Sequence, residues 1–177
     1  MRSFKLAAAL AVAGLTTLAA TPAKAGPAVA ADVEAAVPLL PSRVSAGYAG
    51  NLRLGYKLNL LVLSITPEIG GGYTGLQGDL APGIVRGFVG GRVAVGALVQ
   101  FGVYGHIGYA HVSYDDIGGT KIDGRSAPTY DGGLTLDLTV LPKIDVGVHA
   151  GYMLVAGSDG QRPVATINPG VHAAIIF

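Results

Sequence analysis

This 177-residue chain has no cysteine, so its candidates for acid–base chemistry or metal binding are histidines and carboxylates. The absence of cysteine excludes disulfides, thiolate metal sites and cysteine nucleophiles. His149 and His172 lie on segments that we expect to pair, and Asp32 or Glu34 would come near His172 if the first segment meets the last. Two imidazoles and a carboxylate suit Zn²⁺ or a similar ion. The same residues also make a hydrogen-bonded cluster, and we expect this cluster, without metal or cofactor.

Two further sets contain the residue types of a catalytic site. We expect His106 to approach Asp137, with Asp145 beside it, and a histidine with two carboxylates can transfer protons if a substrate reaches it. Inside a filled protein interior, the same set is structural, and this is the interpretation we favour.

The other set follows the pattern of a serine nucleophile, a histidine base and an acid, in His111, Ser113 and Asp115. Acids this close along one strand orient a histidine poorly, and the spacing is common by chance. We therefore expect polar residues at a membrane interface here and no catalytic residues.

The elements that position these residues are β-strands, because apolar and polar residues alternate with period two. Around 129–140, for example, Leu134, Leu136 and Leu138 share one face, and Thr135 and Asp137 share the other. The pattern predicts strands at about 28–38, 44–57, 61–75, 84–96, 100–115, 129–140, 143–157 and 164–177. Short turns are expected near 58–60, 97–99 and 141–142, and longer connections near 76–83, 116–128 and 158–163.

A few residues depart from the alternation. Large apolar residues fall on the wrong face at Phe88, Val62, Met153 and Val155. Pro67 and Pro169 lie inside predicted strands, where each removes a ladder hydrogen bond, so we expect β-bulges there.

The N-terminus has the pattern of an export signal. Arg2 and Lys5 precede an apolar run over 6–20, and a small-residue cleavage motif ends at Ala25. We expect a signal peptide over 1–25, removed after Sec-type export, and a single domain over 26–177. The run is too short for a transmembrane anchor.

Composition limits the remaining classes of protein. A mean hydropathy of +0.50 and 13% charged residues exclude a disordered chain, and the net charge of +1 argues against a nucleic-acid binder.

Eight antiparallel strands with short turns at one end and longer loops at the other are typical of an outer-membrane β-barrel. The barrel is closed because an open sheet edge in lipid leaves backbone groups unpaired. In such a barrel the apolar face looks toward lipid and the charged face toward the lumen.

The interior of an eight-stranded barrel is narrow enough for side chains to fill. From the predicted turns we expect Glu68 to lie near Asn51 and to form an ion-pair network with Arg53 and Arg92, which Arg86 joins. The other polar lumen residues are His106, Asp137, Asp145, His149 and His172. The alternative is a narrow channel that passes small solutes.

Repeated Gly-Tyr pairs and the last strand carry a family resemblance. Val171, Ala173, Ile175 and Phe177 share one face of a strand that ends in Phe. With the export signal, this resembles the small OmpA/OmpX-like outer-membrane barrels. The resemblance implies that the barrel-assembly machinery reads Phe177, that the partners are outer-membrane lipid and lipopolysaccharide, and that the protein is a monomer without nucleic-acid ligands.

These features predict a non-enzymatic outer-membrane barrel with a structural role or a role in surface interactions. Two alternatives stay open. One is a porin-like channel, and the other is an enzyme, because the His111-x-Ser113 pair is similar to the pattern of lipid A deacylases. The connection over 116–128, which contains Lys121 and Arg125, could contact a cation or lipopolysaccharide phosphate, but we expect a solvated loop.

Overall fold

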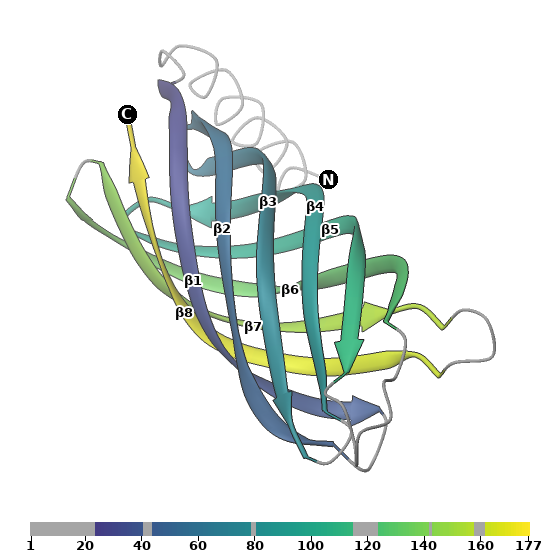
Figure 1. The fold of residues 1–177 in the computed structure, drawn as a ribbon. Helices are drawn as coiled ribbons and strands as arrows, with labels where there is room; N and C mark the ends of the chain where they lie inside the picture. Colours follow the sequence, from purple (N-terminus) through teal and green to yellow (C-terminus); the bar gives the residue numbers. More distant parts are fainter. Residues whose placement is uncertain (1–23, 41–43, 79–80, 115–123, 142, 158–161) are drawn as a thin grey trace, which may run out of the picture.

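Eight long β-strands make up the computed structural model of the chain (Figure 1), which describes residues 24–40, 44–78, 81–114, 124–141, 143–157 and 162–177. The strands are β1 (Lys24–Leu40), β2 (Ser45–Leu60), β3 (Leu63–Gln77), β4 (Pro82–Gly96), β5 (Val99–Tyr114), β6 (Arg125–Leu141), β7 (Ile144–Val155) and β8 (Val164–Ile176). In the part of the chain described here, no helix is long and apolar enough to cross a membrane.

The strands form one closed antiparallel barrel in chain order, as the alternation predicted. β1 pairs with β2 and also with β8. The pairing between β1 and β8 places Asp32 opposite His172. β1 begins and β8 ends at the top of Figure 1, at the same end as the β2–β3 and β4–β5 turns. We call this end the turn end and the opposite one the loop end. Closure leaves no sheet edge with unpaired backbone groups.

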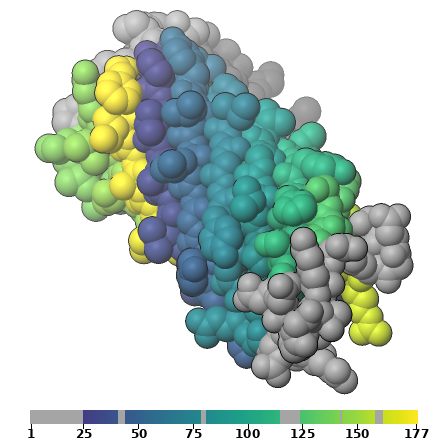
Figure 2. Space-filling model, in the orientation of Figure 1, coloured from purple at the N-terminus to yellow at the C-terminus, as the bar shows by residue number. Residues whose placement is uncertain are grey.

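The two faces of the wall differ in character in the middle and at the turn end of the barrel. Leu52 and Leu134 point outward with 67% and 65% of their surfaces exposed, whereas the neighbouring Arg53 is only 5% exposed. Figure 2 shows the outer surface as a continuous wall in which β8 adjoins β1. The predicted orientation is therefore confirmed, with apolar side chains outside and ionisable ones inside, which is the arrangement that a hydrocarbon surround requires.

Aromatic side chains mark the borders of the apolar belt. Tyr56 and Phe101 are exposed near the turn end, and Tyr48, Tyr73 and Tyr130 are exposed toward the loop end. The rings of Tyr48 and Tyr73 lie with centroids 6.1 Å apart. Amphipathic rings at two levels are typical of a protein that meets lipid headgroups on both sides of a bilayer.

The β2–β3 turn lies two residues later than the sequence predicted. It occupies Leu61 and Val62, and Leu61 has a φ of 59°, the left-handed conformation that two-residue hairpin turns require. Glu68 consequently pairs with Gly55 and not near Asn51. Moving a turn along the chain shifts the register of the whole hairpin, so the expected neighbours of Glu68 were wrong in part.

The two strand prolines do not produce the predicted bulges. Ladder pairing between β2 and β3 skips Pro67 and resumes in the same register, and pairing between β1 and β8 does the same at Pro169. Each proline directs its missing N–H toward one neighbour and pairs normally with the strand on its other side.

The loop-end part of the lumen is mainly apolar, although the alternation predicted a polar lumen. Buried apolar side chains from every strand meet there: Ala36, Val44, Ala49, Leu76, Ile84, Ala110, Val112, Ala127, Met153, Val155 and Val164. Met153 and Val155 broke the alternation because they belong to this cluster. Apart from Arg125 at the loop end, the buried charged side chains among the described residues occupy the middle and the turn end of the lumen.

The outward orientation of Leu134 predicts a depth-dependent cost for a charge. Leu134 lies between Tyr130 and Leu138 on the outer face, and Val140 lies beside the turn end. We expect Leu134→Arg to lower the free energy of unfolding in lipid vesicles by about 2–4 kcal/mol and Val140→Arg by about 0–1 kcal/mol. Urea unfolding measures both. Equal costs at the two positions would contradict the proposed depth of β6.

Candidate functional site: the charged barrel interior

Arg53 is the centre of the interior network. Its Nη2 lies 2.6 Å from Asp32 Oδ1, its Nε donates to Asp32 Oδ2 at 2.9 Å, and its Nη1 lies 2.9 Å from Glu68 Oε2. The structure therefore brings together Arg53 and Glu68, and adds Asp32 from the first strand. All three side chains are buried, so removal of Arg53 would leave two carboxylates without their arginine partner, which is costly in a narrow lumen.

Arg92 does not pair with Glu68 as the predicted register required. It lies opposite Thr66, and its Nη1 contacts Asp137 Oδ1 at 3.2 Å across the lumen. Asp137 also accepts hydrogen bonds from Thr135 and from Nε2 of His172. Arg92 and Asp137 thus link β4 to β6 and β8, and Arg92 belongs to a second group beside the Arg53 group.

His106 pairs with Asp131 and Glu68, and the predicted approach to Asp137 and Asp145 is wrong. Its Nδ1 lies 3.0 Å from Asp131 Oδ2 and its Nε2 lies 2.8 Å from Glu68 Oε1. β6 begins at Arg125, before the predicted start, so Asp131 stands directly opposite His106 in the ladder. Asp137 instead stands opposite Gln100.

Arg86 and Phe88 form a stacked unit beside this histidine. The Arg86 guanidinium lies 4.8 Å from the centroid of the Phe88 ring, and that ring lies 4.7 Å from the ring of His106. Arg86 also pairs with Asp131 at 3.1 Å and donates to Asn51 Oδ1 at 3.1 Å. Phe88 broke the alternation because it fills the lumen here and stacks on a cation.

Lys57 and Asp145 close the turn end of the polar interior. Lys57 Nζ lies 2.6 Å from Asp145 Oδ2, and Thr139 donates to the other carboxylate oxygen at 2.8 Å. Asp145 is therefore far along the barrel from the position beside His106 that we expected. Lys57 is missing from the predicted network, although it lies on the charged face of its segment, which was the available signal.

Little space remains between these side chains. One cavity of about 40 Å³ lies toward the turn end, and a second of about 20 Å³ lies toward the loop end. Arg53, Glu68 and Arg92 line the first cavity, and Arg53 and Arg92 also line the second. Each cavity holds a few water molecules at most. The two arginines therefore stand between the cavities as a barrier.

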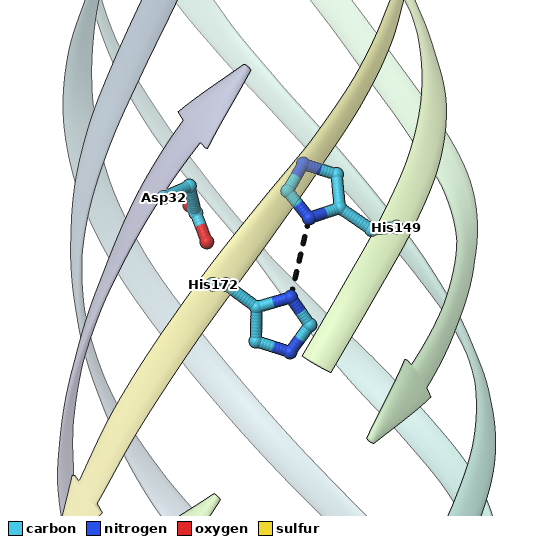
Figure 3. A group of neighbouring side chains, drawn as sticks. All are labelled: Asp32, His149 and His172. Carbon is cyan, nitrogen blue, oxygen red and sulfur yellow. Dashed lines mark hydrogen bonds between the residues drawn. The ribbon is translucent and has the colours of Figure 1, made fainter. Parts of the chain in front are cut away.

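His149 and His172 come together as the sequence predicted, although they are diagonal neighbours and not directly opposite. Their Nδ1 atoms are 3.2 Å apart (Figure 3). His149 Nε2 lies 3.1 Å from Glu34 Oε1, and Asn51 and Asn168 also donate to Glu34. Asp32, from β1, faces the pair, so this cluster joins the first strand to the last two.

His111 and Ser113 point toward the outside, and they do not contact each other as a nucleophile and its base would. His111 Nδ1 lies 3.1 Å from the hydroxyl of Ser126, its partner on β6, while Ser113 donates to the carbonyl of Gly83 at 3.2 Å. Asp115 lies outside the described residues. The expectation that this set does not form a triad remains a prediction.

Arg125, which we placed in a solvated loop, is the first residue of β6 and is buried. It donates to the carbonyl oxygens of Ala156 at 2.5 Å and Arg162 at 2.8 Å, and so ties the start of β6 to the segments around β7 and β8. Most of the predicted loop, including Lys121, lies outside the described residues.

The fold is that of small outer-membrane barrels of known structure. Neisserial surface protein A superposes with a TM-score of 0.65 at 12% identity, over 89% of this chain and 100% of that one. Ail, the attachment invasion locus protein of Yersinia pestis, gives 0.54 at 12% identity over 89% and 100%. The outer membrane enzyme PagL gives 0.54 at 17% identity over 84% and 98%. No protein-family model matches the chain, and no curated protein matches it.

The ion pair between Lys57 and Asp145 predicts rescue by charge exchange. Lys57→Asp or Asp145→Lys alone places like charges within a few ångströms in the lumen, and we expect each to lower the free energy of unfolding by about 3–5 kcal/mol. The double variant restores an ion pair and should recover at least half of the summed loss. Urea unfolding of all four proteins in vesicles gives the coupling. Additive losses in the double variant would refute the contact.

Proposed function

We propose that this chain is an integral protein of the bacterial outer membrane that does not conduct and does not catalyse, and that acts through its structure and its exposed loop end. The observation that carries this proposal is the filled lumen. Two cavities of about 40 and 20 Å³ are far smaller than a continuous water path through a bilayer. The interior thus serves as the core of the protein, which leaves the outer surface and the loops for contact with other molecules.

Two barriers in series support the non-conducting assignment. An ion that enters from the turn end meets the layer of Arg53 and Arg92, whose charges are already neutralised by Asp32, Glu68 and Asp137. Beyond it lies the apolar cluster around Ile84 and Met153, whose side chains cannot coordinate or neutralise an ion. Displacing a buried ion pair and then crossing an apolar layer are both costly.

The surface role agrees with how other proteins use the fold. One similar structure is a neisserial surface protein and another is an attachment and invasion protein, at identities that support the fold alone. We propose monomeric insertion among lipid and lipopolysaccharide, without nucleic-acid ligands. We also propose recognition by the barrel-assembly machinery through Phe177, whose ring is exposed at the end of β8. Export and cleavage near Ala25, which would remove the first two residues of β1, complete this proposed route.

The fold also occurs in an enzyme, PagL, so catalysis on the outer face is the second candidate. The contact between His111 and Ser126 favours it, since a histidine beside a hydroxyl is the minimal nucleophilic pair. Against it, every Asp and Glu among the described residues lies on the lumen side, so none of these can orient His111. Non-enzymatic action is therefore the better-supported proposal.

Planar-bilayer recording of the folded protein tests the closed lumen. We expect no sustained current steps, because the arginine layer and the apolar cluster block the axis in series. A variant that replaces Arg53, Arg92, Ile84 and Met153 by serine removes much of both barriers and should raise the frequency of openings by at least tenfold. Sustained steps from the unaltered protein, at the frequency of an open porin, would establish the channel function instead.

A separate assay tests the enzyme candidate. The folded protein is incubated with purified lipopolysaccharide, and released fatty acid is measured by mass spectrometry. We expect no release above a boiled control. Release that disappears in both His111→Ala and Ser126→Ala, but persists in Ser45→Ala on β2, would overturn the non-enzymatic proposal.

A further inference from the structure

The Nδ1 atoms of His149 and His172 face each other across a short gap, where a positive charge would be stabilised. In Figure 3 the two rings turn their Nδ1 atoms toward each other, and Asp32 stands to one side. The opposite nitrogen of each ring is already occupied, because His149 Nε2 contacts Glu34 at 3.1 Å and His172 Nε2 contacts Asp137. Both rings are buried.

The hydrogen positions on the two rings determine whether their Nδ1 atoms attract or repel each other. A neutral imidazole carries one N–H and a carboxylate can only accept, so the contacts with Glu34 and Asp137 favour a hydrogen on Nε2 of each ring, whereas Arg92 Nη1, a donor 3.4 Å from His172 Nε2, favours the other tautomer of that ring. With the hydrogen on Nε2 of both rings, each Nδ1 presents a lone pair, and the two lone pairs face each other at 3.2 Å. Either a metal ion between the nitrogens or a hydrogen on one of the two Nδ1 atoms resolves this repulsion. A carboxylate behind each ligating imidazole is also the usual support of histidine metal ligands.

The spacing of the nitrogens fits a metal. Two nitrogens bound at about 2.0–2.1 Å to a tetrahedral ion lie about 3.3 Å apart. The observed Nδ1–Nδ1 distance is 3.2 Å. A carboxylate oxygen of Asp32 and one nitrogen of each ring lie within 4.8 Å of one another, which makes Asp32 the candidate third ligand.

The Asp32 carboxylate has free acceptor positions for a metal ion, although it already forms an ion pair with Arg53. Arg53 contacts each oxygen once, at 2.6 and 2.9 Å, and a carboxylate offers about four acceptor positions. The cavity of about 20 Å³ is lined in part by Asp32 and His149, and it can hold a water on that side of the cluster.

The strands are shaped around the two rings. Gly170 is the ladder partner of His149, and Gly147 is the partner of His172. A Cβ atom at Gly170 would lie 2.9 Å from His149 Nε2, and one at Gly147 would lie 2.8 Å from His172 Cε1. Both distances are too short for side-chain atoms, so glycine at these two positions leaves the space in which the rings take this orientation.

We propose that Asp32, His149 and His172 form a binding site for a divalent transition-metal ion of the zinc class. The ligands are Nδ1 of both histidines, one Asp32 oxygen and a water, and Glu34 and Asp137 hold the rings. Because Asp32 lies on β1 and the histidines on β7 and β8, the site is complete only after the first strand has met the last. The ion therefore stabilises the closing seam, and it enters before or during closure because the finished site is buried.

Metal content of the folded protein tests this site. Protein without a histidine tag is folded into detergent with a twofold excess of ZnCl₂, desalted and analysed by plasma mass spectrometry. We expect one zinc per folded chain, and less than a tenth of that in the His149→Gln/His172→Gln variant. His111→Gln is the matched control, since His111 lies on the outer face, and it should keep the full zinc content. Folding is checked for each protein by its heat-dependent gel mobility.

Cobalt gives a second reading of the same site. Folding with CoCl₂ should produce visible absorption of tetrahedral Co²⁺, and Asp32→Asn should change this spectrum while the histidine ligands remain. Folded unaltered protein with no zinc and no cobalt spectrum would show that the two rings share a hydrogen bond and no metal, and would overturn the proposal. Equal zinc in the double histidine variant would overturn it too. Neither outcome bears on whether the lumen conducts.

Discussion

Backbone hydrogen bonding in hydrocarbon is the constraint on which the rest of the structure depends. A strand that crosses a bilayer must pair on both edges, so β1 has to find β8 and close the barrel. Closure divides the side chains into an outer set that meets lipid and an inner set that meets other side chains. Each strand must therefore carry its carboxylates and arginines on one face, and this requirement produces the alternation of the sequence.

The charged side chains of the inner face need partners, because an eight-stranded lumen is too narrow for water to solvate isolated charges. The chain solves it by pairing charges between strands: Asp32 and Glu68 flank Arg53, Asp137 meets Arg92, and Asp145 meets Lys57. Toward the loop end the lumen becomes apolar. The interior is thus a protein core with a polar and an apolar half, and this filling leads to the proposed non-conducting role.

The sequence predicted the fold well because the fold depends on which residues of each strand point inward and which point outward. This alternation is not affected by small errors in the strand boundaries. A strand boundary that is wrong by two residues leaves Arg53 inside and Leu52 outside. Contacts between strands depend instead on register. The β2–β3 turn at Leu61 and the early start of β6 at Arg125 changed the partners of Glu68 and His106. No local signal in the sequence locates such turns to the residue.

The histidine cluster was nevertheless predicted, because the error in the β7–β8 register was small and side chains two positions apart on one face still touch. The donor arrangement was not predictable, since it depends on which ring nitrogen faces Glu34 or Asp137. Likewise, the apolar loop end was missed because residues such as Ile84 and Val112 are as common on a lipid-facing surface as in a core.

Site-by-site labelling of β6 tests the division into two faces most directly. The chain has no cysteine, so each introduced cysteine is unique. Single cysteines at positions 134 to 139 are labelled with a small fluorophore, and the folded proteins are placed in bilayers with brominated acyl chains. Strong quenching at 134, 136 and 138 with weak quenching at 135, 137 and 139 is the predicted result. Quenching without alternation, or strongest at position 137, would contradict a barrel with lipid outside and paired charges within.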